Sequence, residues 1–241
     1  MKTIRDILAI DDEPVIRQVI ARICGGEGLS VDTVDSGAAG LERLARCSYR
    51  LALCDIMMEN LDGFQFLEQA AIRDRRVPVV MVTGYSTVEN AVRSLRCGAI
   101  DFIAKPFTAD ELLAVVRRGL SYGRLMDAAD AAGAPPFVTN CPTRYHRLGQ
   151  MSWAAVEPAG SVLIGVNDIF VKTIGVVRSV VLSPAGSELV QGRVCAVIVA
   201  ADAMTHGVMC PLSGRIIDVN AGAMADSNCN YGVEDGRAAG G

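Results

Sequence analysis

Lysine is nearly absent from this chain of 241 residues. Only Lys2, Lys105 and Lys172 are lysine among 23 basic residues, and the other 20 are arginine. Abundance therefore does not explain a lysine at position 105. Arginine carries a planar fork, whereas lysine carries a compact charge on a flexible stem, so a site that needs a point charge selects lysine. Lys105 is the first candidate for a functional residue.

The sequence also lacks the marks of several classes of protein. A formal net charge of −4 without a block of basic residues disfavours nucleic-acid binding. No apolar stretch approaches the roughly 20 residues that a spanning helix needs, and no signal peptide opens the chain. Two histidines, His146 and His206, are too few for a histidine metal site, and both are expected at the surface. We therefore expect a cytoplasmic protein with no nucleic-acid or membrane partner.

The eight cysteines contain no C-x-x-C pair. Most of them stand within apolar runs, where reduced cysteine packs as a small hydrophobic residue. We therefore expect structural thiols rather than disulfides or zinc ligands.

The first half of the chain alternates apolar runs with segments of helical period. A length of 241 residues suits two domains, because domains cluster at roughly 100–150 residues. The alternation predicts five βα units on a parallel sheet. The apolar runs lie at 6–10, 30–34, 51–54, 78–82 and 101–104. Helix start signals agree with them, at Pro14, Ser36, Gly63, Ser86 or Thr87, and Thr108 with Glu111.

Polar residues close four of these runs. They are Asp11 and Asp12 after the first run, Asp55, Thr83 and Lys105. The carboxyl ends of parallel strands share one edge of a sheet, so these side chains are expected to converge there. Singly, each has a structural alternative: the acidic pair can cap the first helix, Asp55 can be a turn residue and Thr83 a strand end. Together they predict phosphoryl-acceptor chemistry with magnesium.

Four motifs resemble the receiver domain of two-component response regulators. They are Ile10-Asp11-Asp12-Glu13-Pro14, Cys54-Asp55-Ile56-Met57-Met58, Val82-Thr83-Gly84 and Ala104-Lys105-Pro106-Phe107. The resemblance covers residues 1 to about 122. It implies an α/β, flavodoxin-like fold with a five-stranded parallel sheet, and a sensor histidine kinase as partner in phosphorelay signal transduction.

The resemblance assigns the phosphoryl chemistry to named residues. Asp55 is the carboxylate that accepts a phosphoryl group from the kinase, so the chain is expected to be a phosphoprotein with an aspartyl phosphate. Asp12, Asp55 and the backbone carbonyl of Met57 would bind Mg²⁺, and Asp11 would hold metal-bound water. Lys105 would neutralise charge on the phosphoryl group.

The same resemblance implies a switch. Thr83 would hydrogen-bond a phosphoryl oxygen, and Phe102 matches an aromatic position whose ring moves inward as that threonine shifts. The alternative for Phe102 is an ordinary core residue. The Lys105–Pro106 bond would be cis. Receiver domains often pair through their last helices, and Val115, Val116 and Leu120 either supply such a homodimer surface or face the core.

The pattern of apolar residues changes after the receiver-like region. We assign the receiver domain to 1–124, a linker to 125–145, a second domain to 146–232 and a disordered tail to 233–241. Short β-like runs begin at Ser161 and predict a mainly β sandwich or flattened barrel.

The second domain resembles the H protein of the glycine cleavage system, a relative of lipoyl domains. The likeness rests on Trp153, Gly165-Val166-Asn167-Asp168, Leu182-Ser183-Pro184-Ala185-Gly186, Cys210-Pro211-Leu212-Ser213-Gly214 and Val219-Asn220. That family carries lipoate on a lysine at a hairpin tip. The equivalent position here is Ala203, which cannot be modified, and no lysine follows Lys172. We therefore expect Mg²⁺ but no lipoate.

Two functions remain open from the sequence. The first is a response regulator whose second domain binds a protein partner; the alternative is a regulatory accessory or decoy of glycine cleavage or other lipoate-dependent enzymes. A free-standing enzyme is not expected, because Ile56 and Met57 supply no second acid behind Asp55 for a phosphatase. The chain would catalyse only its own phosphorylation and dephosphorylation. The sequence identifies neither the cognate kinase and its input signal, nor the partner of the second domain, nor the oligomeric state.

The phosphorylated state is expected to be long-lived. In the receiver family the positions of Met57 and Tyr85 tune hydrolysis of the acyl phosphate, and neither residue offers an amide or acid to position water. The decay of phosphorylated protein after removal of the phosphodonor measures this lifetime. Loss of the phosphoryl group within seconds would contradict the prediction.

Overall fold

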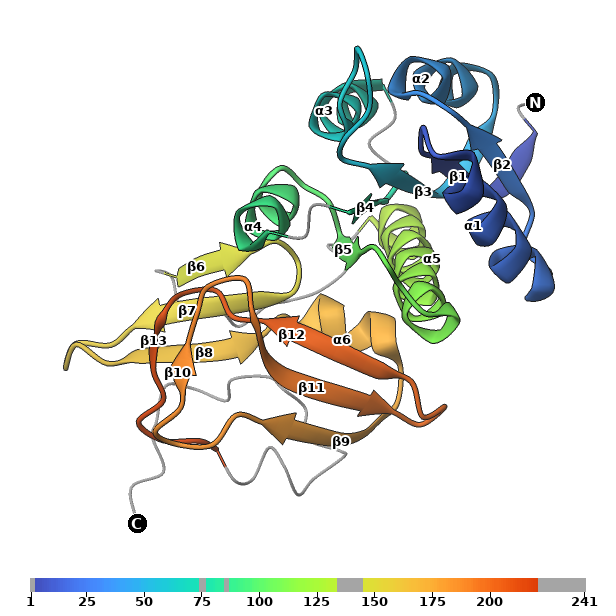
Figure 1. The fold of residues 1–241 in the computed structure, drawn as a ribbon. Helices are drawn as coiled ribbons and strands as arrows, with labels where there is room; N and C mark the ends of the chain where they lie inside the picture. The colour runs from blue at the N-terminus through green and yellow to red at the C-terminus, as the bar shows by residue number, and fades with distance from the viewer. Residues whose placement is uncertain (1–2, 74–76, 85–86, 134–144, 221–241) are drawn as a thin grey trace. The chain divides into compact units, whose positions relative to one another are not determined.

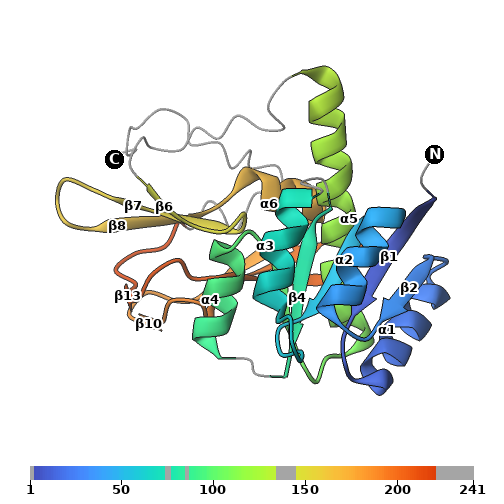
Figure 2. The same cartoon turned by 90° about the horizontal axis from the view of Figure 1, so that it is seen from above.

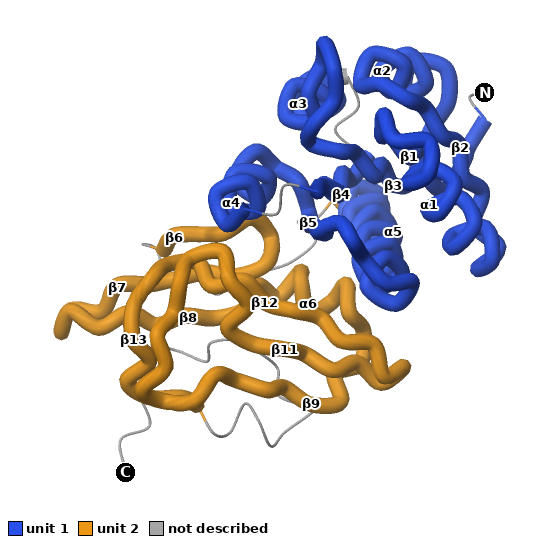
Figure 3. The backbone as a smooth tube through the Cα atoms, in the orientation of Figure 1, with its two compact units in different colours: residues 1–132 blue, residues 133–241 orange. Residues whose placement is uncertain are grey.

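The computed structural model describes residues 3–73, 77–84, 87–133 and 145–220 (Figure 1). The chain divides into two compact units, residues 1–132 and 133–241 (Figure 3). The predicted tail, 233–241, and most of the predicted linker lie outside the described residues.

A parallel sheet of five strands forms the centre of the first unit. The strands are β1 (Ile4–Ile10), β2 (Val31–Val34), β3 (Ser48–Asp55), β4 (Val79–Thr83) and β5 (Asp101–Ala104). Their order across the sheet is β2-β1-β3-β4-β5, and every neighbouring pair is parallel. The predicted α/β fold class is therefore confirmed, because this is the flavodoxin-like order.

Five helices follow the strands in alternation. They are α1 (Pro14–Gly26), α2 (Gly37–Arg46), α3 (Gly63–Arg73), α4 (Val88–Arg96) and α5 (Ala109–Ala132). Residues of α2 and α3 pack on one face of the sheet and those of α1 and α5 on the other, as two views show (Figures 1 and 2). Of the two predicted caps for α4, Thr87 accepts the hydrogen bond from Asn90 N at 3.2 Å, whereas Ser86 lies outside the described residues.

Helices on both faces bury all of β4 and most of β3, which explains why these two strands read as continuous apolar runs. Val115 and Val116 of α5 lie in the core with Leu112, and Leu120 packs against the same cluster. The core alternative therefore holds for these residues, and they do not form a free dimer surface. The helix α5 continues to Ala132, so residues 125–132 of the predicted linker are helical.

A buried ion pair joins α5 to β5. Arg118 Nε donates to Asp101 Oδ2 at 2.7 Å, and both residues are buried. Each of these buried charges is stable only while the other is present. Loss of either partner would leave an uncompensated charge in the interior and destabilise the fold. The pair therefore fixes where α5 sits on the strand that leads to Lys105.

The second unit is mainly β, as predicted. One antiparallel sheet contains β6 (Tyr145–Leu148), β7 (Ser152–Val156) and β8 (Val162–Val166). A second has the order β12-β11-β9, formed by β12 (Thr205–Met209), β11 (Val194–Ala200) and β9 (Val177–Leu182). Two short strands, β10 (Glu188–Leu189) and β13 (Gly214–Arg215), pair with each other.

Four elements of this unit were not predicted: β6, β7, β10 and the helix α6 (Asp168–Ile174). Phe170 of α6 joins Met151, Ile198 and Val208 in the core of the unit. The surface prediction for His206 was wrong, because this residue of β12 is buried, whereas His146 is exposed. In the described part of the chain, no helix combines the length and apolar character that a membrane crossing requires.

Gly63 tests the packing between α3 and β3. A Cβ at this position would lie 2.2 Å from the Asp55 carbonyl oxygen and 2.8 Å from Met81 Cε. We expect Gly63→Ala to lower the free energy of unfolding of the first unit by about 1–3 kcal/mol, since overpacking forces backbone shifts. Differential scanning calorimetry measures the change.

Gly25→Ala is the matched control. A Cβ at Gly25 of α1 would meet no atom within 4 Å. Alanine there should leave the stability unchanged or raise it by up to about 1 kcal/mol, because glycine is unfavourable in helices. Equal stability of Gly63→Ala and the parent protein would contradict the packing described for Gly63.

Candidate functional site

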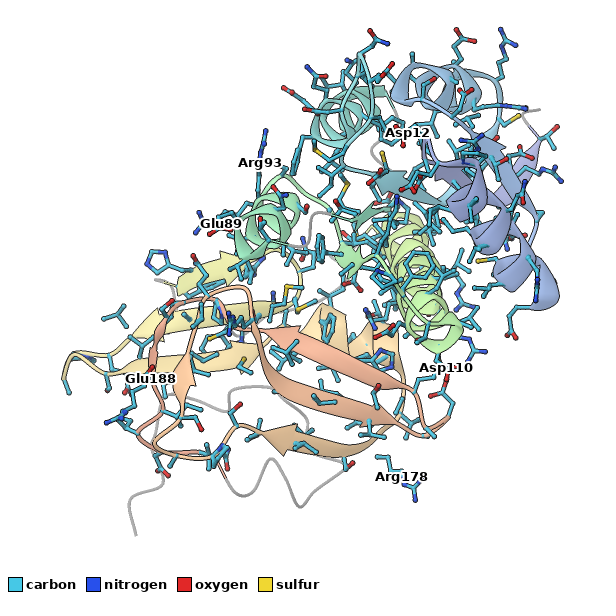
Figure 4. All side chains as sticks on the ribbon, viewed as in Figure 1. Asp12, Glu89, Arg93, Asp110, Arg178 and Glu188 are labelled. Atoms are coloured by element: carbon cyan, nitrogen blue, oxygen red, sulfur yellow. The ribbon has the colours of Figure 1, made fainter. Side chains whose placement is uncertain are left out.

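The predicted site residues meet at the carboxyl edge of the parallel sheet. Asp11 follows β1, Asp55 ends β3, Thr83 ends β4 and Lys105 follows β5. The strand order reverses between β1 and β3, which is where open α/β sheets bind their ligands. Asp12, in the loop after β1, is labelled in Figure 4.

Lys105 stands at the centre of this site. Its Nζ lies 2.8 Å from Asp11 Oδ2, 2.9 Å from Glu13 Oε1 and 3.2 Å from Asp55 Oδ2. Only 8% of the lysine side chain is exposed. A single ammonium therefore holds three carboxylates that come from the loop after β1 and the end of β3. We call Asp11, Asp12, Glu13 and Asp55 the acidic cluster.

Burial and charge shift the pKa values within the site. Burial raises the pKa of Asp55 and of Asp11 above the usual value, and the Lys105 charge opposes the rise in both cases. Burial would lower the pKa of Lys105, but the hydrogen bonds that its ammonium donates to Asp11 and Glu13, together with the charge of Asp55, raise it instead. Lys105 therefore stays positively charged. Its single positive charge does not fully neutralise the negative charges of the carboxylates around it.

The donor set fits a hard divalent cation. Asp11, Asp12 and Asp55 each offer a carboxylate oxygen, and these atoms lie within 4.8 Å of one another. Asp55 Oδ1 is buried and has no hydrogen-bond partner in the described part of the chain. Carboxylate oxygens with room for water are what Mg²⁺ selects. A divalent cation there would also compensate the excess negative charge.

Two residues near the site had no predicted role. Glu13 has no predicted role beyond its place in the Ile10–Pro14 motif, yet its carboxylate is a direct partner of Lys105. Arg17 Nη1 donates to the backbone carbonyls of Asp11 at 2.5 Å and Asp12 at 3.0 Å. Arg17 thus fixes the loop that presents both carboxylates. The sequence does contain a signal for this contact: Arg17 lies about one turn into the helix that Pro14 begins, close to the loop that carries Asp11 and Asp12.

The remaining predicted residues lie around this centre. Thr83 is fully buried at the end of β4, and its carbonyl accepts from Lys105 N at 2.7 Å. Phe102 of β5 is half-buried and packs against the core cluster that contains Met81. Met57 lies two residues beyond Asp55 with an exposed side chain. The Lys105–Pro106 bond is cis, as the resemblance implied, and Tyr85 lies outside the described residues.

In the second unit, Ala203 lies in the exposed turn between β11 and β12. Ala203 N donates to Ala200 O at 3.0 Å, and Asp202 Oδ1 accepts from Met204 N at 3.1 Å. These bonds close a tight turn in which Ala203 has a φ of 67°, the left-handed region that alanine adopts at some cost. The turn is therefore a formed, exposed projection.

Comparisons with known proteins divide the chain in the same way. Residues 7–117 match the family model of the response regulator receiver domain, and residues 143–229 match that of the glycine cleavage H-protein. The chain therefore joins a receiver domain to an H-protein domain. The acidic cluster belongs to the receiver domain, and Ala203 to the H-protein domain.

Two curated regulators match part of this chain at about one-third identity. The transcriptional regulatory protein ZraR of Escherichia coli O157:H7 is 31% identical over 163 residues, 66% of this chain and 37% of that protein. The DNA-binding transcriptional regulator NtrC of Escherichia coli K12 is 37% identical over 116 residues, 48% of this chain and 25% of that protein. The matches thus span well under half the length of these relatives.

A solved structure supports the same assignment. The crystal structure of NtrX from Brucella abortus is 34% identical, with a TM-score of 0.51, over 54% of this chain and 30% of that one. The similarity, like that of the two regulators, involves only part of the related protein.

Replacing the exposed carboxylate of Asp12 tests the metal site without disturbing the core. We expect Asp12→Asn to raise the dissociation constant for Mg²⁺ about tenfold, because one of three converging carboxylates loses its charge. Isothermal titration calorimetry measures the affinity. Glu42→Gln, which alters an exposed carboxylate on α2, is the control and should bind like the parent. Equal affinity in Asp12→Asn would contradict the site.

Proposed function

We propose that this protein is a response regulator that a sensor histidine kinase phosphorylates on Asp55. The observation that carries the proposal is the environment of Asp55: a buried carboxylate with one unpartnered oxygen, beside the Lys105 ammonium and two further carboxylates. Converging charges of this kind suit phosphoryl transfer, in which positioning and charge neutralisation do most of the work.

In the proposed reaction a carboxylate oxygen of Asp55 attacks the phosphorus of a phosphohistidine. The oxygen–phosphorus bond forms as the phosphorus–nitrogen bond breaks, and the histidine leaves with the electron pair. Mg²⁺ bound by Asp12, Asp55 and the Met57 carbonyl, with Asp11 holding its water, would neutralise charge on the phosphoryl oxygens. Lys105 would neutralise a further oxygen.

Glu13 gives Lys105 a partner in the unphosphorylated protein. Its side chain is more than half exposed, whereas Asp11 and Asp55 are buried. The Glu13 bond is therefore the one most easily exchanged for a bond to a phosphoryl oxygen, since an exposed carboxylate regains water when it leaves. Lys105 would move from Glu13 to the phosphoryl group without losing a counter-charge.

Phosphorylation would then alter the face formed by α4, β5 and α5. Thr83 would turn toward a phosphoryl oxygen, and Phe102 would fill the space it leaves. Arg93 of α4 stacks on the Phe64 ring of α3, with 3.8 Å from Cζ to the ring centroid. Arg93 points from α4 toward α3 in Figure 4. This contact would have to weaken if α4 shifts.

The H-protein domain would act as a docking module for a protein partner. Ala203 stands where the family carries its lipoyl lysine, so lipoate is not part of the proposal. The scaffold and its exposed turn remain available for recognition. The chain would thus be a phosphoacceptor with a protein-binding output, rather than a nucleic-acid binder or a free-standing enzyme.

Acetyl phosphate tests the receiver chemistry directly. With Mg²⁺, the parent protein should gain one phosphoryl group that hydroxylamine removes, because hydroxylamine cleaves acyl phosphates; Asp55→Ala should gain none. Lys105→Arg should react at least about tenfold more slowly, since a planar fork replaces a point charge. Intact mass spectrometry gives both extent and rate.

Glu59→Gln is the control, because it alters an exposed carboxylate in the loop after Asp55. It should be phosphorylated at the parent's rate. A parent protein that takes up no phosphoryl group, or an Asp55→Ala variant that takes up as much as the parent, would refute the proposal.

The match of residues 143–229 to the glycine cleavage H-protein supports a second candidate, a decoy of lipoate-dependent enzymes. A chain without the lipoyl lysine would occupy the docking site of the lipoylated protein without carrying substrate. In a reconstituted glycine cleavage reaction, excess chain should lower the rate, and more lipoylated H protein should restore it. An unchanged rate at large excess would rule the decoy out.

A further inference from the structure

The two acidic residues that follow β1 are held very differently by the fold. Asp11 is buried and is anchored by both its backbone and its carboxylate. Its N donates to Val34 O at 3.2 Å, and its Oδ1 accepts from Glu13 N at 3.0 Å. Its Oδ2 lies 2.8 Å from Lys105 Nζ. Several independent contacts therefore fix the Asp11 carboxylate.

Asp12 depends on a single residue. It is exposed, and in the described part of the chain its one hydrogen bond comes from Arg17, whose Nη1 lies 3.0 Å from the Asp12 carbonyl oxygen. The same nitrogen donates to the Asp11 carbonyl at 2.5 Å. The carbonyl and the carboxylate of a residue are attached to the same Cα, so a fixed carbonyl limits the directions in which the carboxylate can point. Arg17 therefore controls the placement of Asp12 more than that of Asp11.

Arg17 holds this loop without neutralising it. A guanidinium commonly pairs with a carboxylate through two parallel hydrogen bonds. Here both bonds go to backbone carbonyls, and among the described residues Arg17 forms no ion pair with the acidic cluster. The Asp12 carboxylate therefore keeps its negative charge available, and it lies within 4.8 Å of the oxygens that Asp11 and Asp55 offer to a cation.

We propose that Arg17 is a positioning residue for the divalent cation: its two hydrogen bonds hold the Asp12 carboxylate in the place where the ion binds. Residues that orient a metal ligand in this way typically change metal affinity by about 10- to 100-fold. The inference deepens the proposed function, since it rests on the Mg²⁺ site. It concerns cation binding, however, and does not require phosphorylation of Asp55.

The positive charge of Arg17 makes the sign of the effect informative. Removal of a positive charge beside the acidic cluster would, through electrostatics alone, strengthen the binding of a cation. Removal of the two hydrogen bonds would weaken it, because Asp12 would have to be ordered when the ion binds. The two effects oppose each other, so weaker binding after loss of the guanidinium identifies positioning as the larger one.

Arg17→Met in the full-length protein tests the inference, because methionine keeps an unbranched stem and a good helix propensity but has no N–H donor and no charge. Mn²⁺ is the probe, since it accepts the same oxygen ligands as Mg²⁺ and electron paramagnetic resonance measures the free ion. We expect the dissociation constant for Mn²⁺ to rise about tenfold. Arg22→Met, at an exposed position of the same helix, is the control and should bind like the parent or slightly more tightly. Differential scanning calorimetry verifies that each variant is folded.

A double-mutant cycle with Asp12→Asn separates positioning of Asp12 from general damage to the site. If Arg17 acts through Asp12, Arg17→Met should cost little further affinity in the Asp12→Asn protein. Two independent tenfold losses would instead multiply to about a hundredfold.

Equal or tighter Mn²⁺ binding by Arg17→Met, or multiplied losses in the double variant, would overturn the inference and leave the proposed function standing. A parent protein that binds no Mn²⁺ would overturn the metal site and the inference together. A parent protein that binds Mn²⁺ but takes up no phosphoryl group would refute the proposed function alone.

Discussion

The ammonium group of Lys105 is the interaction on which the functional arrangement of this protein depends. It contacts Asp11 and Glu13, which come from the loop after β1, and Asp55, which ends β3. Buried carboxylates repel one another and lose solvation, so they remain close only with a counter-charge. The same excess of negative charge that Lys105 does not fully offset makes the site receptive to a divalent cation. Arginine could not replace this lysine, because three separate acceptors surround a single nitrogen.

The fold holds Lys105, and with it the ammonium group, in a fixed position. Lys105 N donates to the carbonyl of Thr83, so the lysine is tied to the end of the neighbouring strand β4. The buried pair of Asp101 and Arg118 fixes α5 against the strand that precedes the lysine. A phosphoryl group on Asp55 would therefore affect β4, β5 and α5 together. These contacts give a physical route from Asp55 to the face formed by α4, β5 and α5.

Periodicity and turn chemistry sufficed to predict the five βα units and the convergence of Asp11, Asp12, Asp55 and Lys105, because strand ends share an edge. They did not predict the Glu13–Lys105 contact, which joins positions 92 residues apart. The helix α6 was missed because Asp168–Ile174 is short and rich in β-branched residues, which read as strand. His206 was placed at the surface because a lone histidine carries no burial signal.

The central claim is that charge at Asp55 is transmitted to the face formed by α4, β5 and α5. Hydrogen–deuterium exchange of the full-length protein, with and without Mg²⁺ and beryllofluoride, tests it most directly. Beryllofluoride stands in for the phosphoryl group on the carboxylate. The account predicts altered amide exchange in α4 and β5 of the parent protein and no change in Asp55→Ala. Unaltered exchange in both elements of the parent, or the same alteration in Asp55→Ala, would contradict it.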